Sequence, residues 1–313
     1  MIIQIQDLTK RYGDVVAVDH LSFDVEQGEI FGLLGPNGAG KTTTIRVIMD
    51  ILSPDTGSVT VLGQPPGKAK SRVGYLPEER GLYRRVKVLD TLVYLAELKG
   101  VPRNTARERA MDLLERIQLE DWAARKVSDL SQGMQQRLQL AASLVHDPEV
   151  LFLDEPFQGL DPVNVERVKD LVAELHREGK TIVLSSHQMN LVEALCDRIL
   201  LINQGQAVIY GTLAEIKQAY APNTVRVRAP HIPIDLPGVV DVEPDDGAFN
   251  LTLVEGGSPQ AMLRALLDRD VEIQAFEVAP VPLEEIFVAA VSGEEADAAI
   301  PMARHPREDN ELA

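Results

Sequence analysis

The sequence predicts an α/β protein: a core of buried strands and helices with an antiparallel β subdomain and an inserted helical subdomain, followed by a small α+β domain. Three observations support this prediction. Short apolar runs at 30–34, 150–154 and 181–186 are typical of buried strands in a parallel sheet. Apolar residues recur at helical spacing between 88 and about 145. Beyond about 221 the pattern changes to alternating strands with two helices.

The first 25 residues are expected to form short antiparallel strands. Ile3, Ile5 and Leu8 lie at the spacing of the inward face of an edge strand. Residues 10–14 are expected to turn, and short strands at 15–18 and 21–25 follow. The chain then enters the apolar run at 30–34.

A glycine-rich loop follows that run and leads into a helix. Gly35-x4-Gly40-Lys41-Thr42 fits the pattern of a loop that cradles phosphates. Glycines let backbone N–H groups turn inward, and the first helical turn adds unpaired N–H groups. Lys41 can reach the β- and γ-phosphates of a nucleotide, and Thr42 can ligate Mg2+. The expected nucleotide-binding residues of this segment are Gly35, Pro36, Asn37, Gly38, Ala39, Gly40, Lys41, Thr42 and Thr43.

Two other segments could also touch a nucleotide. Tyr12 lies near the expected turn and could stack on adenine, since aromatic faces favour flat ligands; the alternative is a surface or packing tyrosine. Ser131 and Gly133 open a further helix in the helix-rich region and could donate to an anion. The alternative there is a plain helix N-cap.

Acidic residues end the second buried strand. Asp154 and Glu155 close the run at 150–154, at the strand end that faces the ligand crevice of an open α/β sheet. One carboxylate can hold Mg2+, and the other can deprotonate an attacking water. The alternative is a pair of solvated acids. His187 ends the third buried strand and could donate a hydrogen bond to the γ-phosphate, or it could be structural.

Composition restricts the class of protein. The chain has 313 residues and a net charge of −17, with no apolar run of membrane-spanning length and no signal-like start. Its one cysteine, Cys196, excludes an internal disulfide and fits a reducing compartment. No basic patch dense enough for nucleic acid is visible in the sequence.

Charge also marks a domain boundary. From Ala221 onward there are six arginines, no lysine and eighteen Asp or Glu residues, a net of −12. We therefore expect a first domain at 1–220, with its helical subdomain at about 80–145, and a small α+β domain at 221–291. Residues 292–313 are acidic and poor in apolar anchors, so a disordered tail is expected.

Taken together, these segments resemble the ATP-binding subunit of an ABC transporter over about residues 3–220. Six of its motifs match in order: the adenine-stacking aromatic, Walker A, the Q-loop, the signature, Walker B, and the D-loop with the switch histidine. They fall at Tyr12, 35–42, Glu78, 130–136, 150–155, and 159–161 with His187. The resemblance implies a P-loop NTPase core.

Two positions depart from the family pattern. Glu78 stands where a glutamine is usual, and the signature has Leu-Ser-Gln-Gly-Met in place of Leu-Ser-Gly-Gly-Gln. Glu78 can still ligate Mg2+ or its water but adds negative charge near the γ-phosphate. These departures and the C-terminal unit resemble an exporter-type branch that includes sodium-extrusion ATPase subunits.

The resemblance implies an Mg2+-dependent ATPase that pairs head to tail with a second copy or a paralogue. In that arrangement Lys41 binds phosphate, Thr42 and Asp154 serve Mg2+, Glu155 is the general base and His187 senses the γ-phosphate. Ser131 and Gly133 complete the partner's site. The subunit would be cytoplasmic, held at the inner face of the membrane by separate polytopic permease subunits. The substrate stays open: sodium, a drug or another small solute.

Two alternatives remain. One is an ATPase of the same type acting on nucleic acid or ribosomes; such proteins usually carry two ATPase sets or a long coiled-coil insertion, and neither is present. The other is a regulatory nucleotide-binding module without hydrolysis, which the Asp154-Glu155 pair disfavours.

Overall fold

The computed structural model describes residues 1–79, 81–220, 224–233, 235–245, 247–254, 256–278 and 281–292. The chain divides into two compact units, and the boundary between them in the sequence falls between Leu213 and Ala214. The predicted boundary at 221–223 and all of the predicted tail beyond residue 292 lie outside the described residues.

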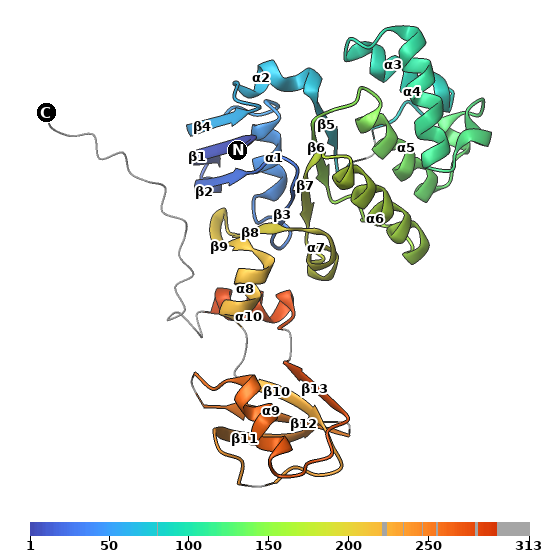
Figure 1. Ribbon diagram of the computed structural model, residues 1–313. Helices are drawn as coiled ribbons and strands as arrows, with labels where there is room; N and C mark the ends of the chain where they lie inside the picture. Colours follow the sequence, from blue (N-terminus) through green and yellow to red (C-terminus); the bar gives the residue numbers. More distant parts are fainter. Residues whose placement is uncertain are drawn as a thin grey trace, which may run out of the picture. The chain divides into compact units, whose positions relative to one another are not determined.

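A six-stranded sheet forms the centre of the first unit (Figure 1). Its order is β5-β6-β7-β3-β8-β9, in which the first five strands are parallel and β9 is antiparallel to β8. The strands are β3 Ile30–Leu34, β5 Val73–Leu76, β6 Val150–Asp154, β7 Thr181–Ser186, β8 Arg198–Asn203 and β9 Gln206–Thr212. Every residue of β3, β6 and β7 is buried, as the continuous apolar runs predict.

An antiparallel sheet of order β2-β1-β4 lies beside the central sheet. Its strands are β1 Ile3–Tyr12, β2 Val15–Val25 and β4 Thr56–Val61. Ile3, Ile5 and Leu8 are fully buried, which confirms the predicted inward face of β1.

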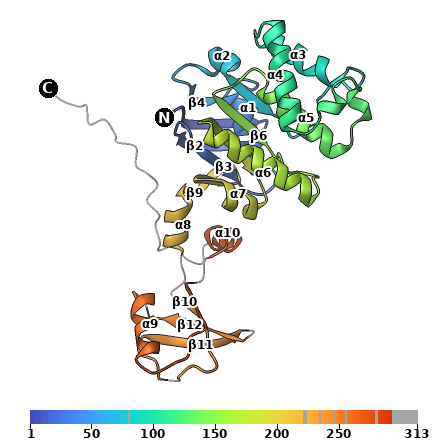
Figure 2. The same ribbon diagram turned by 45° about the vertical axis from the view of Figure 1, so that its right-hand side comes forward.

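The remaining elements of this unit are helical. Helices α3, α4 and α5 gather on the side of the central sheet away from the antiparallel sheet, and α5 packs on β5 (Figure 2). The α-helices are α1 Lys41–Ile48, α2 Pro66–Ala69, α3 Val88–Leu98, α4 Arg103–Arg116, α5 Gln132–Leu144, α6 Pro162–Arg177 and α7 Met189–Leu195. Short 3-10 helices lie at η1 Lys70–Arg72, η2 Glu120–Trp122 and η3 Val127–Asp129.

The second unit is a small α+β structure, as predicted. Its four-stranded antiparallel sheet has the order β11-β12-β10-β13. The strands are β10 Thr224–Arg228, β11 Val239–Asp245, β12 Ala248–Leu253 and β13 Ala275–Val278, and the helices are α9 Pro259–Leu267 and α10 Leu283–Ser292. Helix α8, Leu213–Ala219, spans the division between the units. Among the described residues, no helix combines the length and apolar character that crossing a membrane requires.

Two local predictions were wrong. The expected turn at 10–14 is confined to Gly13 and Asp14, because Tyr12 pairs directly with Val15. The two expected short strands after it form the single strand β2, in which His20 adopts a left-handed φ of 49° at a register shift. The polar residues there mark a β-bulge rather than a turn.

In the second unit, the sequence run 271–278 forms a strand only in its second half. Val271, at the start of this run, lies in a loop, where its N–H donates to Leu266 O. Only β13, four residues at the end of that run, pairs with β10.

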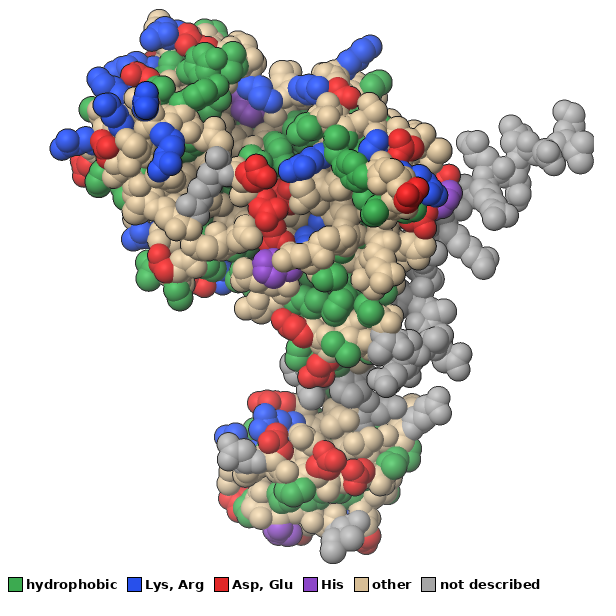
Figure 3. Space-filling view, turned by 180° about the vertical axis from the view of Figure 1, so that it is seen from behind, with side chains coloured by type: hydrophobic (Ala, Val, Ile, Leu, Met, Phe, Trp, Pro, Cys, Tyr) green, Lys and Arg blue, Asp and Glu red, His purple; other side chains and the backbone are tan. Residues whose placement is uncertain are grey.

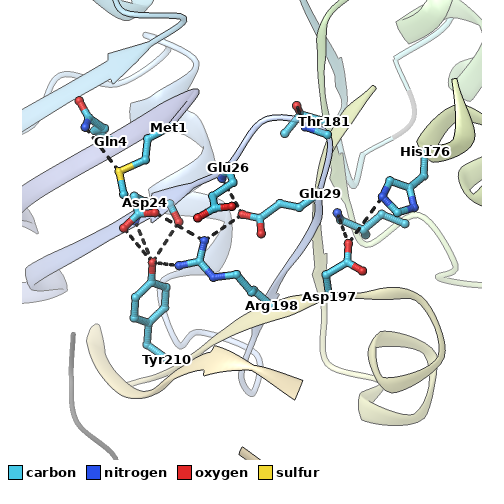
Figure 4. Close-up of polar contacts among 12 residues, drawn as sticks. Met1, Gln4, Asp24, Glu26, Glu29, His176, Thr181, Asp197, Arg198 and Tyr210 are labelled. Atoms are coloured by element: carbon cyan, nitrogen blue, oxygen red, sulfur yellow. Dashed lines mark hydrogen bonds and ion pairs between the residues drawn. The ribbon is translucent and has the colours of Figure 1, made fainter. Parts of the chain in front are cut away.

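A half-buried polar cluster joins the two sheets of the first unit at the start of β3 (Figure 4). Arg198 of β8 makes ion pairs with Asp24 of β2 at 3.5 Å and with Glu29 at 3.2 Å. Arg198 also donates to the Tyr210 hydroxyl, which donates to Asp24 Oδ1 over 3.0 Å. Burial raises the pKa of Glu29, and the Arg198 charge opposes that rise. The cluster therefore fixes the strand that delivers the glycine-rich loop.

Replacing the central cation tests how strongly this cluster holds the unit. We expect Arg198→Met to lower the free energy of unfolding by about 3 kcal/mol, because Asp24 and Glu29 would lose their cation. Urea unfolding followed by tryptophan fluorescence isolates the first unit, since Trp122 is the only tryptophan of the chain. The control is Lys169→Met, which removes an exposed ion pair with Glu166 and is expected to change the free energy by less than about 0.5 kcal/mol. Equal effects would contradict the structural importance of the cluster.

Candidate functional site

The glycine-rich loop leaves the end of β3 with a backbone that only glycine can follow. Gly35, Gly38 and Gly40 have φ values of 145°, 81° and 111°. A Cβ atom on Gly35 would lie 2.1 Å from Ile202 O, and one on Gly40 would lie 2.4 Å from Ala17 O. Backbone carbonyls of β8 and β2 thus lie close to the loop on two sides, which explains why Gly35 and Gly40 carry no side chain.

Helix α1 begins immediately after this loop, at Lys41. Its N-cap residue, Gly40, offers no side-chain cap, and its first turn carries no acidic residue. The backbone N–H groups of that turn have no intrahelical acceptor, and they carry the positive end of the helix dipole. The end of this helix therefore suits an anion.

A cavity of about 390 Å3 opens at the start of α1. It brings together most of the predicted phosphate-binding residues with two predicted carboxylates. The lining residues are Ala17, Asn37, Gly38, Ala39, Gly40, Lys41, Thr42, Thr43, Glu78 and Glu155. Residues from four segments, β2, the loop, the region after β5 and the end of β6, thus meet at one cavity.

Lys41 contacts both its own loop and the acidic side of the cavity. Its ammonium donates to Gly35 O at 2.7 Å and Pro36 O at 3.3 Å, and lies 3.5 Å from Glu155 Oε1. Both side chains are about 6% exposed. Glu155 Oε1 receives no hydrogen bond from the described residues, so the charge of Lys41 is its main compensation.

Glu155 is held from the opposite side as well. His187 Nδ1 lies 3.0 Å from Glu155 Oε2, and the Glu155 N–H donates to Ser185 Oγ over 3.1 Å. Glu155 has a left-handed φ of 50°, a strained conformation for a residue with a side chain. The chain thus turns sharply after β6 and directs this carboxylate into the cavity.

Asp154 lies one residue earlier and is completely buried. Its Oδ1 accepts hydrogen bonds from Ser185 Oγ at 2.5 Å and Thr42 Oγ1 at 3.2 Å. Its Oδ2 has no hydrogen-bond partner among the described residues. Burial raises the pKa of Asp154, and the two hydroxyl donors act against that rise. The second carboxylate oxygen is therefore an unsatisfied acceptor.

This arrangement fits a magnesium ion that brings most of its ligands with it. Hard divalent cations prefer oxygen ligands, and Mg2+ in phosphate sites is commonly held by one or two protein oxygens plus phosphates and water. Asp154 and Thr42 would supply the protein oxygens. Among the described residues, no group of three or more His, Cys, Asp or Glu side chains is placed to hold a metal by itself.

Seven predicted residues are not part of the cavity lining. Gly35, Pro36, Asp154 and His187 adjoin it through the contacts described above. The other three, Tyr12, Ser131 and Gly133, make none of these contacts. Ser131 is exposed and caps α5, where its Oγ accepts from Met134 N at 3.4 Å, so the plain N-cap alternative is observed. Gly133 packs against Asn164, which would lie 2.7 Å from a Cβ at this position. Tyr12 ends β1 and is 48% exposed, with Lys10 Nζ 5.9 Å from its ring centre.

Sequence reasoning missed the hydroxyl that organises the two carboxylates. Ser185 donates to Asp154 and accepts from the backbone of Glu155. The available signal was a hydroxyl residue at the end of an otherwise apolar strand. It also missed Gln136, a buried residue of α5 whose side chain donates to Pro156 O at 3.2 Å, just beyond Glu155.

Comparisons with known proteins agree with this geometry. Residues 18–158 match the family model for ABC transporters, and residues 211–291 match the C-terminal domain of DrrA1-3-like ATP-binding proteins. The chain is 40% identical over 297 residues to YhaQ, an uncharacterized ABC transporter ATP-binding protein of Bacillus subtilis, covering 93% of this chain and 98% of that one.

Two further similarities cover the first unit. A Nod factor export ATP-binding protein I of Burkholderia pseudomallei is 41% identical over 243 residues, covering 72% of this chain and 79% of that one. A solved structure of the ATP binding subunit of an ABC transporter has a TM-score of 0.65 at 28% identity, covering 70% of this chain and 93% of that one.

The buried carboxylate of Asp154 generates a prediction about stability. Because its pKa is raised in the folded state, its ionised form opposes folding at any pH above that raised value. We expect Asp154→Asn, without nucleotide at neutral pH, to raise the free energy of unfolding by about 1 kcal/mol, as often happens when a functional site is relieved of strain.

The same substitution at Asp147 provides the control. The Lys180 hydrogen bond lowers the pKa of Asp147, so its ionised form favours folding at neutral pH. Asp147→Asn is therefore expected to lower the free energy of unfolding. Urea unfolding followed by Trp122 fluorescence measures both variants, and shifts of the same sign would contradict the assignment.

Proposed function

This chain belongs to the ATP-binding proteins of ABC transporters, and we propose that it hydrolyses Mg2+-bound ATP at the cavity around Lys41 and Glu155 to move separate membrane subunits. The observation that carries the proposal is the convergence of a loop lysine, a Thr42–Asp154 pair and a directed glutamate on one cavity. Main-chain amides would bind the phosphates at one end, and a carboxylate would activate water at the other.

Phosphate binding requires Lys41 to change partners. Its ammonium now donates to two loop carbonyls and neutralises Glu155. Phosphate oxygens would replace these acceptors, together with the amides of the loop and of the first turn of α1. This loop conformation, in which the amides stay accessible, requires glycine at two positions. A side chain at Gly35 or Gly40 would collide with a neighbouring carbonyl oxygen.

Thr42 and Asp154 would hold Mg2+ by their hydroxyl and carboxylate oxygens. Bound there, the ion would neutralise phosphate charge and stabilise the negative charge that develops during transfer of the γ-phosphoryl group. Ser185 keeps Asp154 oriented through its 2.5 Å hydrogen bond. Glu78 also faces the cavity and would contact the ion or its water.

Glu155 would act as the general base. Glu155 lines the cavity, and its Oε1 lacks a hydrogen-bond donor within the described residues, so an attacking water could donate to it. His187 contacts the other carboxylate oxygen and would position it while donating to the γ-phosphate. Acceptance of the water proton by Oε1 would leave a hydroxide-like nucleophile in line with the phosphate.

We propose that a second subunit completes each site. Ser131 and Gly133 lie outside the cavity of their own chain, and Ser131 is exposed at the start of α5. Head-to-tail pairing would place them against the partner's phosphates, and Tyr12 would stack on adenine. Closure of the pair on ATP would then be transmitted near Glu78 and the helical part to permease subunits at the inner face of the membrane.

Similarity to proteins of export systems supports an export role, with the substrate undefined. We assign residues 1–220 to the ATPase domain and 221–291 to an accessory domain. The two separate family matches support a two-domain chain, with the second match beginning at residue 211. We also assign 292–313 to a tail; its first residue, Ser292, ends α10, and residues 293–313 lie outside the described part of the chain.

Removing the base should separate binding from turnover. Glu155→Gln is expected to bind ATP and form a stable pair, with the hydrolysis rate lowered roughly 100-fold or more because the amide cannot take the water proton. Phosphate release and light scattering measure the two properties. The control Glu149→Gln lies just before β6, at its opposite end, and should retain full turnover. Full activity of Glu155→Gln would remove this residue as base.

Removing the lysine should abolish binding itself. Lys41→Ala is expected to lose detectable ATP affinity in titration calorimetry, because the phosphates lose their cation within the loop. The control Lys68→Ala, an exposed residue of α2, should bind as the unaltered chain does. Unchanged affinity of Lys41→Ala would contradict the phosphate-loop assignment.

A further inference from the structure

Two segments that lie 40 residues apart in sequence run side by side in the helical part of the first unit. Val88 N donates to Arg125 O, Val127 N to Val86 O, and Ser128 N to Arg84 O, at 2.8–3.0 Å. Lys87 and Lys126 form an isolated antiparallel bridge. The pairing collects five cations, which we call the basic ribbon: Arg84, Arg85, Lys87, Arg125 and Lys126.

The charges of the basic ribbon are not neutralised within the described part of the chain. All five residues are exposed, and none makes an ion pair with a described residue. Lys87 and Lys126 face each other across the bridge, and like charges directly opposite are destabilising. An anionic partner would relieve this repulsion.

Nearby carboxylates do not compensate the ribbon. Asp129 accepts hydrogen bonds from Lys126 N at 3.2 Å and Ser128 Oγ at 3.1 Å. Its carboxylate is therefore bound within its own turn and not to a ribbon side chain. Asp90 and Asp121 are exposed in flanking helical turns without a recorded ion pair to the ribbon. Charges of this −17 chain that lie more than about 8 Å from the ribbon are largely screened at physiological salt.

Exposed aromatic and apolar side chains flank the cations. Tyr83 is 53% exposed and its ring lies 5.9 Å from that of Tyr94, which is 45% exposed. Val86, between ribbon residues, is 38% exposed, and Leu98, one helical turn beyond Tyr94, is 64% exposed. Figure 3 shows Lys and Arg side chains beside apolar ones over the helical part, at the upper left.

We propose that the basic ribbon binds the anionic phosphate groups of a lipid surface directly. Clusters of four to eight Lys and Arg residues attract anionic headgroups, and tyrosines favour the level of the membrane interface. Arginine in particular donates paired hydrogen bonds to phosphate. A broad anionic surface matches five exposed cations with flanking tyrosines better than a narrow acidic peptide does. This contact goes beyond the proposed function, in which permease subunits alone hold the chain at the membrane.

Vesicle sedimentation with the full chain tests the proposal without nucleotide. The chain is expected to sediment with vesicles of phosphatidylcholine and phosphatidylglycerol but not with phosphatidylcholine alone, and less as salt rises. If each cation contributes about five-fold in affinity, Arg125→Gln with Lys126→Gln should weaken binding roughly 25-fold. Arg84→Gln with Arg85→Gln and Lys87→Gln should weaken it roughly 100-fold.

The control is Arg103→Gln with Arg107→Gln, which removes two exposed cations of α4 outside the ribbon. It should bind anionic vesicles as the unaltered chain does. Urea unfolding followed by Trp122 fluorescence checks that each variant folds. The two ribbon segments are altered in separate variants, so that if one variant does not fold, the other still tests the proposal.

Three outcomes would overturn the proposal: equal binding to neutral and anionic vesicles, ribbon variants that bind like the unaltered chain, or a control as weak as the ribbon variants. Poly-glutamate or single-stranded RNA that binds through the ribbon, without any vesicle binding, would identify a different anionic partner. Because ATP takes no part in the assay, its failure would leave the proposed hydrolysis untouched.

Discussion

The close approach of three backbone segments around the glycine-rich loop is the constraint on which this structure depends. Carbonyl groups of Ile202 and Ala17 lie where side chains at Gly35 and Gly40 would otherwise project. The loop can therefore neither widen nor accept a side chain without displacing β8 or β2. This tight contact holds the loop in place at the start of α1, beside the cavity. The pairing of β7 with both β3 and β6 brings the ends of these two strands to the same edge of the sheet.

The strands and helices that carry this loop were predictable because their signals are local. Continuous apolar runs predicted β3, β6 and β7, and helical periodicity predicted α3 and α4. The bulge at His20 was not predictable, because a polar pair within a strand gives the same pattern as a turn. Arg198 was also missed: its partners Asp24 and Glu29 lie 174 and 169 residues away, and no local pattern joins them.

The candidate site also combines residues that local sequence patterns predict with residues that only the fold brings together. Spacing alone predicted the loop, and the position of two acids at the end of an apolar strand singled out Asp154 and Glu155. In the fold Glu155 lines the cavity, and Asp154 contacts the lining residue Thr42. Ser185 was overlooked, since only the folded sheet shows that it contacts both. The basic ribbon could not be seen either, because it arises when two separate short runs of cations pair. The placement of Ser131 and Gly133 at a neighbour's phosphates stays a prediction, as does the stacking of Tyr12.

The contact between Lys41 and Glu155 has a consequence for control of the reaction. One ammonium neutralises the acid that would activate water and is also the group that phosphate must capture. Arrival of the substrate would therefore free the carboxylate in the same event that anchors the nucleotide. The general base then becomes available only when nucleotide is bound. A subunit without nucleotide therefore needs no separate inhibitor to remain inactive.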